Sequence, residues 1–194
     1  EDVTDVASFA KASAKGGLYG LDGLFGIYVG ADMMDSNTQI LYIGQSGLAM
    51  HNRDYYLLSQ HEALREGYKA FLEKVFILAG AQDPQACAKD AFDVEMAIAA
   101  PYWSMVQQRD VEAQYNPMSS EKLFETYPAL CLKEYFEELN IAPQEKLIVE
   151  QPSYFEALNV MVSQFGADKL KHFLQAKLLH GACGVLDDEF YAAS

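Results

Sequence analysis

Apolar side chains recur at helical spacing along residues 64–76, and this periodicity constrains the fold more than any other feature of the sequence. Ser59 and Glu62 precede the run at the spacing of a capping box, and Gly80 follows it. The pattern predicts a long helix with one buried face. Six side chains form that face: Leu64, Tyr68, Phe71, Leu72, Val75 and Phe76.

Other segments also carry helical patterns. Asp83-Pro84 is a helix start, with Asp as the cap and Pro in the first turn, and Pro101 predicts an end or a kink near Ala100. Residues 102–108 are a candidate continuation beyond that kink. Pro152-Ser153 followed by Glu156 predicts a further capped helix. The remaining helices are expected at residues 1–14, 119–126, 130–139 and 168–182, the last with Leu178 on its apolar face.

Two runs rich in Ile, Tyr, Val and Phe, residues 24–31 and 39–45, predict strands. The segment MDSNT at 34–38 predicts the turn between them, and Asn116-Pro117 predicts another turn. Residues 147–149 are a candidate third strand. The chain of 194 residues shows no internal repeat and no linker. We therefore expect one domain over residues 1–194, mainly α-helical, with a small β-hairpin near 24–45.

The charge balance narrows the functional classes. The chain has 28 acidic and 14 basic residues, which gives a net charge of −14. Such a surface argues against binding nucleic acid or anionic lipid, because both depend on Lys and Arg. No apolar stretch reaches the roughly 20 residues of a membrane span, so we expect no membrane contact by this domain.

The three cysteines, Cys87, Cys131 and Cys183, are widely spaced and form no CxxC pair. This spacing excludes a disulfide scaffold and a cysteine-based zinc site. Three free thiols and one disulfide with a spare thiol both remain compatible with the sequence.

Motifs for self-contained catalysis are incomplete. His61-Glu62 begins like a zincin helix, but Arg65 stands where His-Glu-x-x-His needs its second histidine. Ser46, in Gly44-Gln45-Ser46-Gly47, lacks the Gly-x-Ser-x-Gly elbow by one position. We therefore assign no catalytic residue, no metal ligand and no cofactor to this chain.

Two strings, residues 45–57 and 103–117, are unusual enough to single out. The first predicts a glycine-dependent turn, then a helix capped by Asp54, with Tyr55 and Tyr56 directing their hydroxyls outward. The second predicts a helix end held by an Arg109-Asp110 pair.

These strings resemble the non-catalytic domain of the neprilysin and endothelin-converting-enzyme family of zinc metallopeptidases. In that family a GLG-type turn leads into RDYY after a hairpin, and a later string follows the pattern W-S-x-x-x-x-R-D…Y-N. We expect the matching residues to be structural and not to bind substrate. They are Ser46, Gly47, Leu48, Arg53, Asp54, Tyr55, Tyr56, Trp103, Arg109, Asp110, Tyr115 and Asn116.

The resemblance implies a two-domain enzyme whose catalytic domain binds zinc through His-Glu-x-x-His and a downstream Glu. This chain would be a fragment of it: the helical lid domain, which covers the active-site chamber and restricts substrates to peptides. Zinc would belong to the parent enzyme. The partners would be the catalytic domain of the same polypeptide and peptide substrates, at an extracytoplasmic location.

The sequence also departs from the family pattern. Ala49 and His51-Asn52 replace the usual Gly and Pro-Asp, and the Asn-Ala-aromatic segment that binds the substrate backbone is missing. Alternative readings are a free-standing peptide- or protein-binding module, or a degenerate homologue that lost its catalytic half and acts as a regulator.

Overall fold

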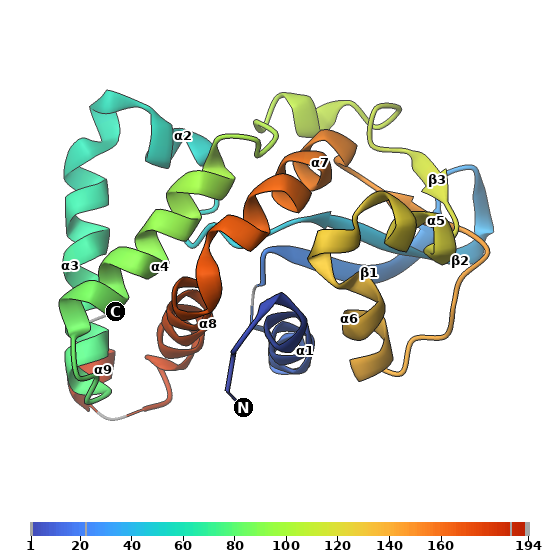
Figure 1. The fold of residues 1–194 in the computed structure, drawn as a ribbon. Helices are drawn as coiled ribbons and strands as arrows, with labels where there is room; N and C mark the ends of the chain where they lie inside the picture. Colours follow the sequence, from blue (N-terminus) through green and yellow to red (C-terminus); the bar gives the residue numbers. More distant parts are fainter. Residues whose placement is uncertain (1, 22, 187, 193–194) are drawn as a thin grey trace.

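The computed structural model describes residues 2–21, 23–186 and 188–192 (Figure 1). Its α-helices are α1 (Val6–Gly17), α2 (Arg53–Leu57), α3 (Glu62–Leu78), α4 (Pro84–Ala99), α5 (Ser120–Thr126), α6 (Leu132–Glu138), α7 (Pro152–Met161), α8 (Gly166–Ala182) and α9 (Asp188–Tyr191). The strands are β1 (Phe25–Asp32), β2 (Asp35–Gln45), β3 (Asn116–Met118) and β4 (Leu147–Val149). Short 3-10 helices are η1 (Ser59–His61), η2 (Gln107–Arg109), η3 (Pro128–Leu130) and η4 (Val162–Gln164). The mainly helical fold with a small β-hairpin is confirmed.

The four strands form one sheet in the order β1-β2-β4-β3. β1 and β2 form the predicted antiparallel hairpin, and β4 joins β2 in parallel although about a hundred residues separate them in sequence. β3 closes the sheet antiparallel to β4. Asn116-Pro117 therefore lies in a strand, and the predicted turn there is wrong. Proline is tolerated because β3 is an edge strand.

The sheet buries both faces, but in two separate clusters. Leu41, Ile43 and Val149 belong to the main core together with the helices, whereas Ile40, Tyr42 and Ile148 form a small cluster on the opposite face. This alternation follows from the two-residue period of a strand. Figure 1 shows α3, α4 and α8 on one side of the molecule and the sheet on the other, with α1 in contact with both α6 and α8.

The hairpin turn differs from its prediction. Only Met33 and Met34 separate the strands, and the pairing then jumps from Asp32↔Asp35 to Ala31↔Gln39. Residues 36–38 form an irregularity inside β2. There the Asp35 side chain accepts hydrogen bonds from the Asn37 backbone N–H (3.1 Å) and the Thr38 hydroxyl (2.7 Å). The Asp and Asn residues do bend the chain locally, but beyond the turn itself.

Three predictions about helix ends are also corrected. No side-chain cap bond opens α3, because η1 precedes it, and none opens α7 at Gln151. The start of α4 is confirmed: the Asp83 side chain accepts from the Ala86 N–H at 3.0 Å. Beyond Pro101 the helix does not continue over residues 102–108, and η2 is the only regular segment there among the described residues.

The apolar face of α8 is rotated relative to the prediction. Leu170, Phe173 and Leu174 are buried, as expected, but Leu178 is 58% exposed. Lys177 is buried in its place, at 7% exposure. An ammonium group is buried only when a partner compensates its charge, which directs attention to the carboxylate that it meets.

Candidate functional site

The two strings of the predicted motif meet at the end of β2. The Gln45 side chain accepts a hydrogen bond from the Trp103 N–H (2.7 Å) and donates one to the Trp103 carbonyl (3.2 Å). The guanidinium of Arg53 donates to the Tyr102 carbonyl at 2.5 Å. Two segments about fifty residues apart in sequence are thereby fixed side by side.

Gln151 extends this contact to the start of α7. Its side-chain oxygen accepts from the Gln45 N–H (2.8 Å), and its amide nitrogen donates to Gln114 (3.2 Å). The indole N–H of Trp103 donates to the Ser153 hydroxyl at 2.7 Å. We call Gln45, Trp103, Gln114 and Gln151 the motif junction.

The glycine turn of the first string has little space around it. Gly47 has a φ of +96°, and a Cβ there would lie 2.6 Å from the Gly23 carbonyl oxygen. The carbonyl of Ser46 accepts from the Tyr154 hydroxyl at 3.3 Å, and Leu48 is buried in the main core. A side chain at position 47 would therefore be strained both by the backbone and by the close contact.

The cap of α2 is not the predicted residue. Asn52 is the N-cap, and its side chain accepts from the Asp54 N–H at 3.0 Å, so that Asp54 lies in the first turn. Tyr56 is 1% exposed and directs its hydroxyl inward, contrary to the prediction. Tyr55 is half-buried and packs edge-on against the His61 ring, with centroids 4.9 Å apart.

The Tyr56 hydroxyl contacts a buried carboxylate, that of Glu95, which the sequence patterns did not indicate. Glu95, on α4, is 0% exposed, and Lys177 on α8 donates to its Oε1 at 2.6 Å. Tyr68 on α3 also donates to Oε1, at 2.8 Å, and Tyr56 donates to Oε2. The Ala49 N–H approaches Oε2 at 3.4 Å. We call Glu95, Lys177, Tyr56 and Tyr68 the Glu95 cluster.

Both tyrosines of this cluster have altered acidity. Burial raises the pKa of Tyr56 and of Tyr68 well above the usual value, and the negative charge of Glu95 raises them further. Each hydroxyl thus stays protonated and serves as a hydrogen-bond donor. The cluster satisfies both oxygens of a fully buried carboxylate, so it holds four helices together and offers no open acid or base.

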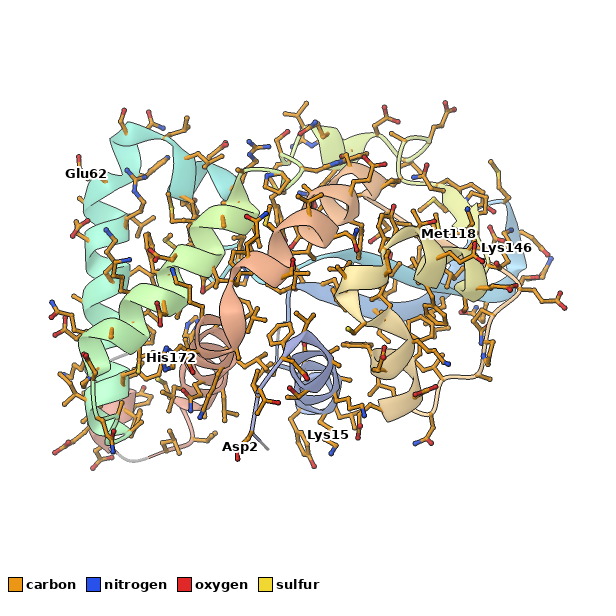
Figure 2. The ribbon with its side chains drawn as sticks, viewed as in Figure 1. Asp2, Lys15, Glu62, Met118, Lys146 and His172 are labelled. Atoms are coloured by element: carbon orange, nitrogen blue, oxygen red, sulfur yellow. The ribbon has the colours of Figure 1, made fainter. Side chains whose placement is uncertain are left out.

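A second carboxylate lies at the other end of the molecule. Asp32 ends β1, is 3% exposed, and accepts from the Lys146 ammonium (2.6 Å), the Tyr115 hydroxyl (2.8 Å) and the Met34 N–H (2.9 Å). Figure 2 labels Lys146 at the sheet end of the molecule. The Lys146 hydrogen bond is the largest cause that lowers the pKa of Asp32 to about 2.

Other residues of the second string also bond to backbone. The Asn116 side chain donates to the carbonyls of Val149 (3.0 Å) and Ala113 (2.8 Å). Asp110 accepts from the Ala113 N–H at 3.0 Å, and Arg109 ends η2. Arg109 and Asp110 lie at the end of η2, where Asp110 is the C-cap residue, so their role in holding this helix end stays a prediction.

The cysteines and histidines lie in ordinary surroundings. The three cysteines are free, with Cys87 and Cys183 buried and Cys131 half-buried. His172 on α8 lies 2.8 Å from Asp90 on α4. In the part of the chain that the structure describes, no three His, Cys, Asp or Glu side chains are grouped to hold a metal ion. Nor do the described helices include one long and apolar enough to cross a bilayer.

Comparison with known proteins identifies the family. The sequence profile of the N-terminal region of peptidase family M13 matches residues 1–194. Endothelin-converting enzyme 1 of Homo sapiens is 26% identical over 183 residues, which cover 90% of this chain and 24% of that protein. An endothelin-converting enzyme homolog of Locusta migratoria is 30% identical over 159 residues, 76% of this chain and 22% of that protein. The chain thus spans about a quarter of these relatives.

A solved protein structure shares the fold of this chain. The cryo-EM structure of the zinc metalloprotease Zmp1 of Mycobacterium tuberculosis in its open state superimposes with a TM-score of 0.92. The match is 23% identical in sequence and covers 97% of this chain and 30% of that chain. On the profile match over its whole length, this chain belongs to peptidase family M13.

Proposed function

We propose that this chain is the non-catalytic, helical domain of a neprilysin-like zinc metalloendopeptidase and forms one unit over residues 1–194. In this proposal it covers the active-site chamber and restricts substrates to peptides. Its partner is the catalytic domain of the same polypeptide, and the enzyme works outside the cytoplasm. The observation that carries the proposal is the family match over the whole chain, in relatives about four times as long.

The zinc of such an enzyme does not fit the residues described here. No group of three potential ligands is present among them. His61 has Arg65 one helical turn on, and the guanidinium of Arg65 donates to the Tyr55 and Leu58 carbonyls (2.9 and 2.7 Å). We therefore place zinc in the parent enzyme, and this chain alone is expected to be inactive.

The residues of the family motif act, in this proposal, as structural residues. The contacts of Arg53, Trp103, Tyr115 and Asn116 support this role, because each is made to another segment of this chain. Hydrogen bonds to charged groups contribute about 1.5–3 kcal/mol each. Arg53→Ala is therefore expected to destabilise the isolated chain by roughly that amount, measured by urea unfolding.

A matched variant separates this role from substrate binding. Lys74→Ala removes an exposed cation from α3 and is expected to leave the unfolding midpoint unchanged. If Arg53→Ala also leaves the midpoint unchanged but alters peptide cleavage by the full-length enzyme, Arg53 binds substrate and the structural assignment fails.

The experiment that tests the proposal is to read the native gene in frame beyond the codon for Ser194. We expect His-Glu-x-x-His followed by a Glu ligand. A stop codon shortly after Ser194 would contradict the proposal and would favour a free-standing binding module.

A further inference from the structure

β1 is an open edge of the sheet. In the described part of the chain it pairs only with β2, whereas the opposite edge, β3, has three residues and includes Pro117. In an antiparallel pair, alternate residues direct their N–H and C=O groups away from the partner strand. Tyr28 and Val29 are 49% and 66% exposed, so both faces are accessible in the middle of this strand. β1 thus presents unpaired backbone groups to the surroundings.

An uncharged hollow adjoins this edge on the helical face of the sheet. Its volume is about 330 Å³, and it lies between the end of α1, the start of β1 and α6. Gly17, Leu18, Leu21, Ile27, Tyr135 and Leu139 are among its lining residues. Such a space fits one apolar side chain from a neighbouring strand.

On the opposite face of the sheet the carboxylate of Glu150 lies over Gly44 of β2 and is reached from β1 by Tyr28. The ring of Tyr28 stacks on that of Tyr42, with centroids 5.0 Å apart and planes at 6°. The Tyr28 hydroxyl donates to Glu150 at 2.7 Å. Among the described residues no cation lies within ion-pair distance of Glu150, and the lysine nearest to it in sequence, Lys146, is paired with Asp32. A basic group alongside β1 would therefore meet an uncompensated negative charge.

We propose that the β1 edge binds an extended peptide as an added strand, with an apolar side chain in the hollow and a basic side chain beside Tyr28 and Glu150. Backbone hydrogen bonds supply affinity in this mode, and alternate side chains supply specificity. Because successive side chains of a strand point to opposite faces, the favoured sequence alternates basic and apolar residues. The proposal concerns this chain alone, so its failure would leave the proposed function untouched.

The test uses the whole chain and a capped peptide, acetyl-Lys-Phe-Lys-Val-Lys-Thr-amide. NMR titration is expected to shift the backbone amides of Ile27 and Val29. Their N–H groups point away from β2, because their register partners Ile43 and Leu41 belong to the alternate residues of β2 that face β4, as the Glu150 N–H bond to the Ile43 carbonyl shows. The same peptide with N-methyl groups on alternate residues, which removes about two backbone hydrogen bonds, should bind roughly tenfold more weakly.

Three variants locate the side-chain contacts. Glu150→Gln is expected to weaken binding about threefold to tenfold, with a smaller salt dependence. Gly17→Leu, which partly fills the hollow, should weaken binding of the Phe peptide but not of its Ala analogue. Glu125→Gln on α5, distant from β1 in the sheet order, is the matched control and should change nothing.

Three results would overturn the proposal. The first is equal affinity for the N-methylated peptide. The second is a set of shifted amides confined to the separate hollow between α3 and α4, whose lining includes Phe92 and Met96. The third is a shift of the β1 amides on raising protein concentration without peptide, which would assign the edge to a second copy of the chain.

Discussion

The two buried carboxylates of this domain make the same kinds of contact at different depths. Glu95 and Asp32 each accept from a lysine, from tyrosine and from a backbone N–H. Around Glu95 both charged side chains are buried, at 0% and 5% exposure, whereas the Lys146 side chain beside Asp32 is 45% exposed. The first cluster joins helices and the second joins strand ends. The degree of burial, and not the kinds of hydrogen-bond partner, should therefore determine how much each carboxylate contributes to the stability of the fold.

The largest effect is expected from Lys177→Met. It leaves Glu95 as a buried charge without a compensating cation, and breaking a buried pair in this way costs about 3–5 kcal/mol. Urea unfolding followed by circular dichroism measures the loss. Lys122→Met, in the exposed pair with Glu125 at 3.9 Å, is the control and should cost less than about 1 kcal/mol. Equal losses in the two variants would remove the distinction by depth.

The next effect is the coupling between Glu95 and Lys177. Glu95→Gln in the Lys177→Met background removes the uncompensated charge, so the double variant should be more stable than the sum of the single losses predicts. We expect a coupling energy of about 0.5–3 kcal/mol from a double-mutant cycle. Strict additivity would mean that the two side chains do not depend on each other.

A pair of tyrosine variants compares the two clusters directly. Tyr68→Phe removes one donor to the fully buried Glu95 carboxylate, at a cost of about 1.5–3 kcal/mol. Tyr115→Phe removes the matching donor to Asp32, where the exposed Lys146 admits solvent, and should cost less. Thermal unfolding of the two variants side by side measures the difference. The reverse order would contradict the account.

The smallest expected effect is a pH dependence at Asp32. Its pKa is lowered to about 2 in the fold, so the carboxylate stabilises the folded state above its unfolded pKa of roughly 4. This contribution is lost as the pH falls through about 2. The difference in melting temperature between the wild type and Asp32→Asn should thus be constant above about pH 5 and shrink between pH 4 and 2. A constant difference down to pH 2 would show that Asp32 carries no such linkage.

The sequence predicts which segments form helices and strands better than it predicts where each helix begins. Helical periodicity locates α3, α4 and α8, and the β-branched and aromatic runs locate the hairpin. The predicted caps at Ser59, Asp54 and Ser153 fail, because short-range patterns cannot reveal that η1 precedes α3 or that Asn52 is closer to the helix start.

The Glu95 cluster was missed although a signal existed. Glu95 follows Ala91 by four residues and precedes Ile98 by three, so it falls on the buried face of α4. Lys177 follows Phe173 by four residues and Leu174 by three, so it falls on the buried face of α8. Charged residues at core positions of two helices predict a buried pair, but which helices meet is decided by tertiary packing. The Gln45–Trp103 contact likewise depends on segments far apart in sequence.

The central claim is that this domain covers the active-site chamber of an enzyme and does not itself catalyse peptide cleavage. The most direct test is to measure peptide cleavage by the purified chain. The chain is incubated with a mixture of fluorogenic peptides, with added zinc and with a chelator. We predict no cleavage above background in either condition. Zinc-dependent cleavage that the chelator abolishes and that follows the chain through purification would contradict the claim.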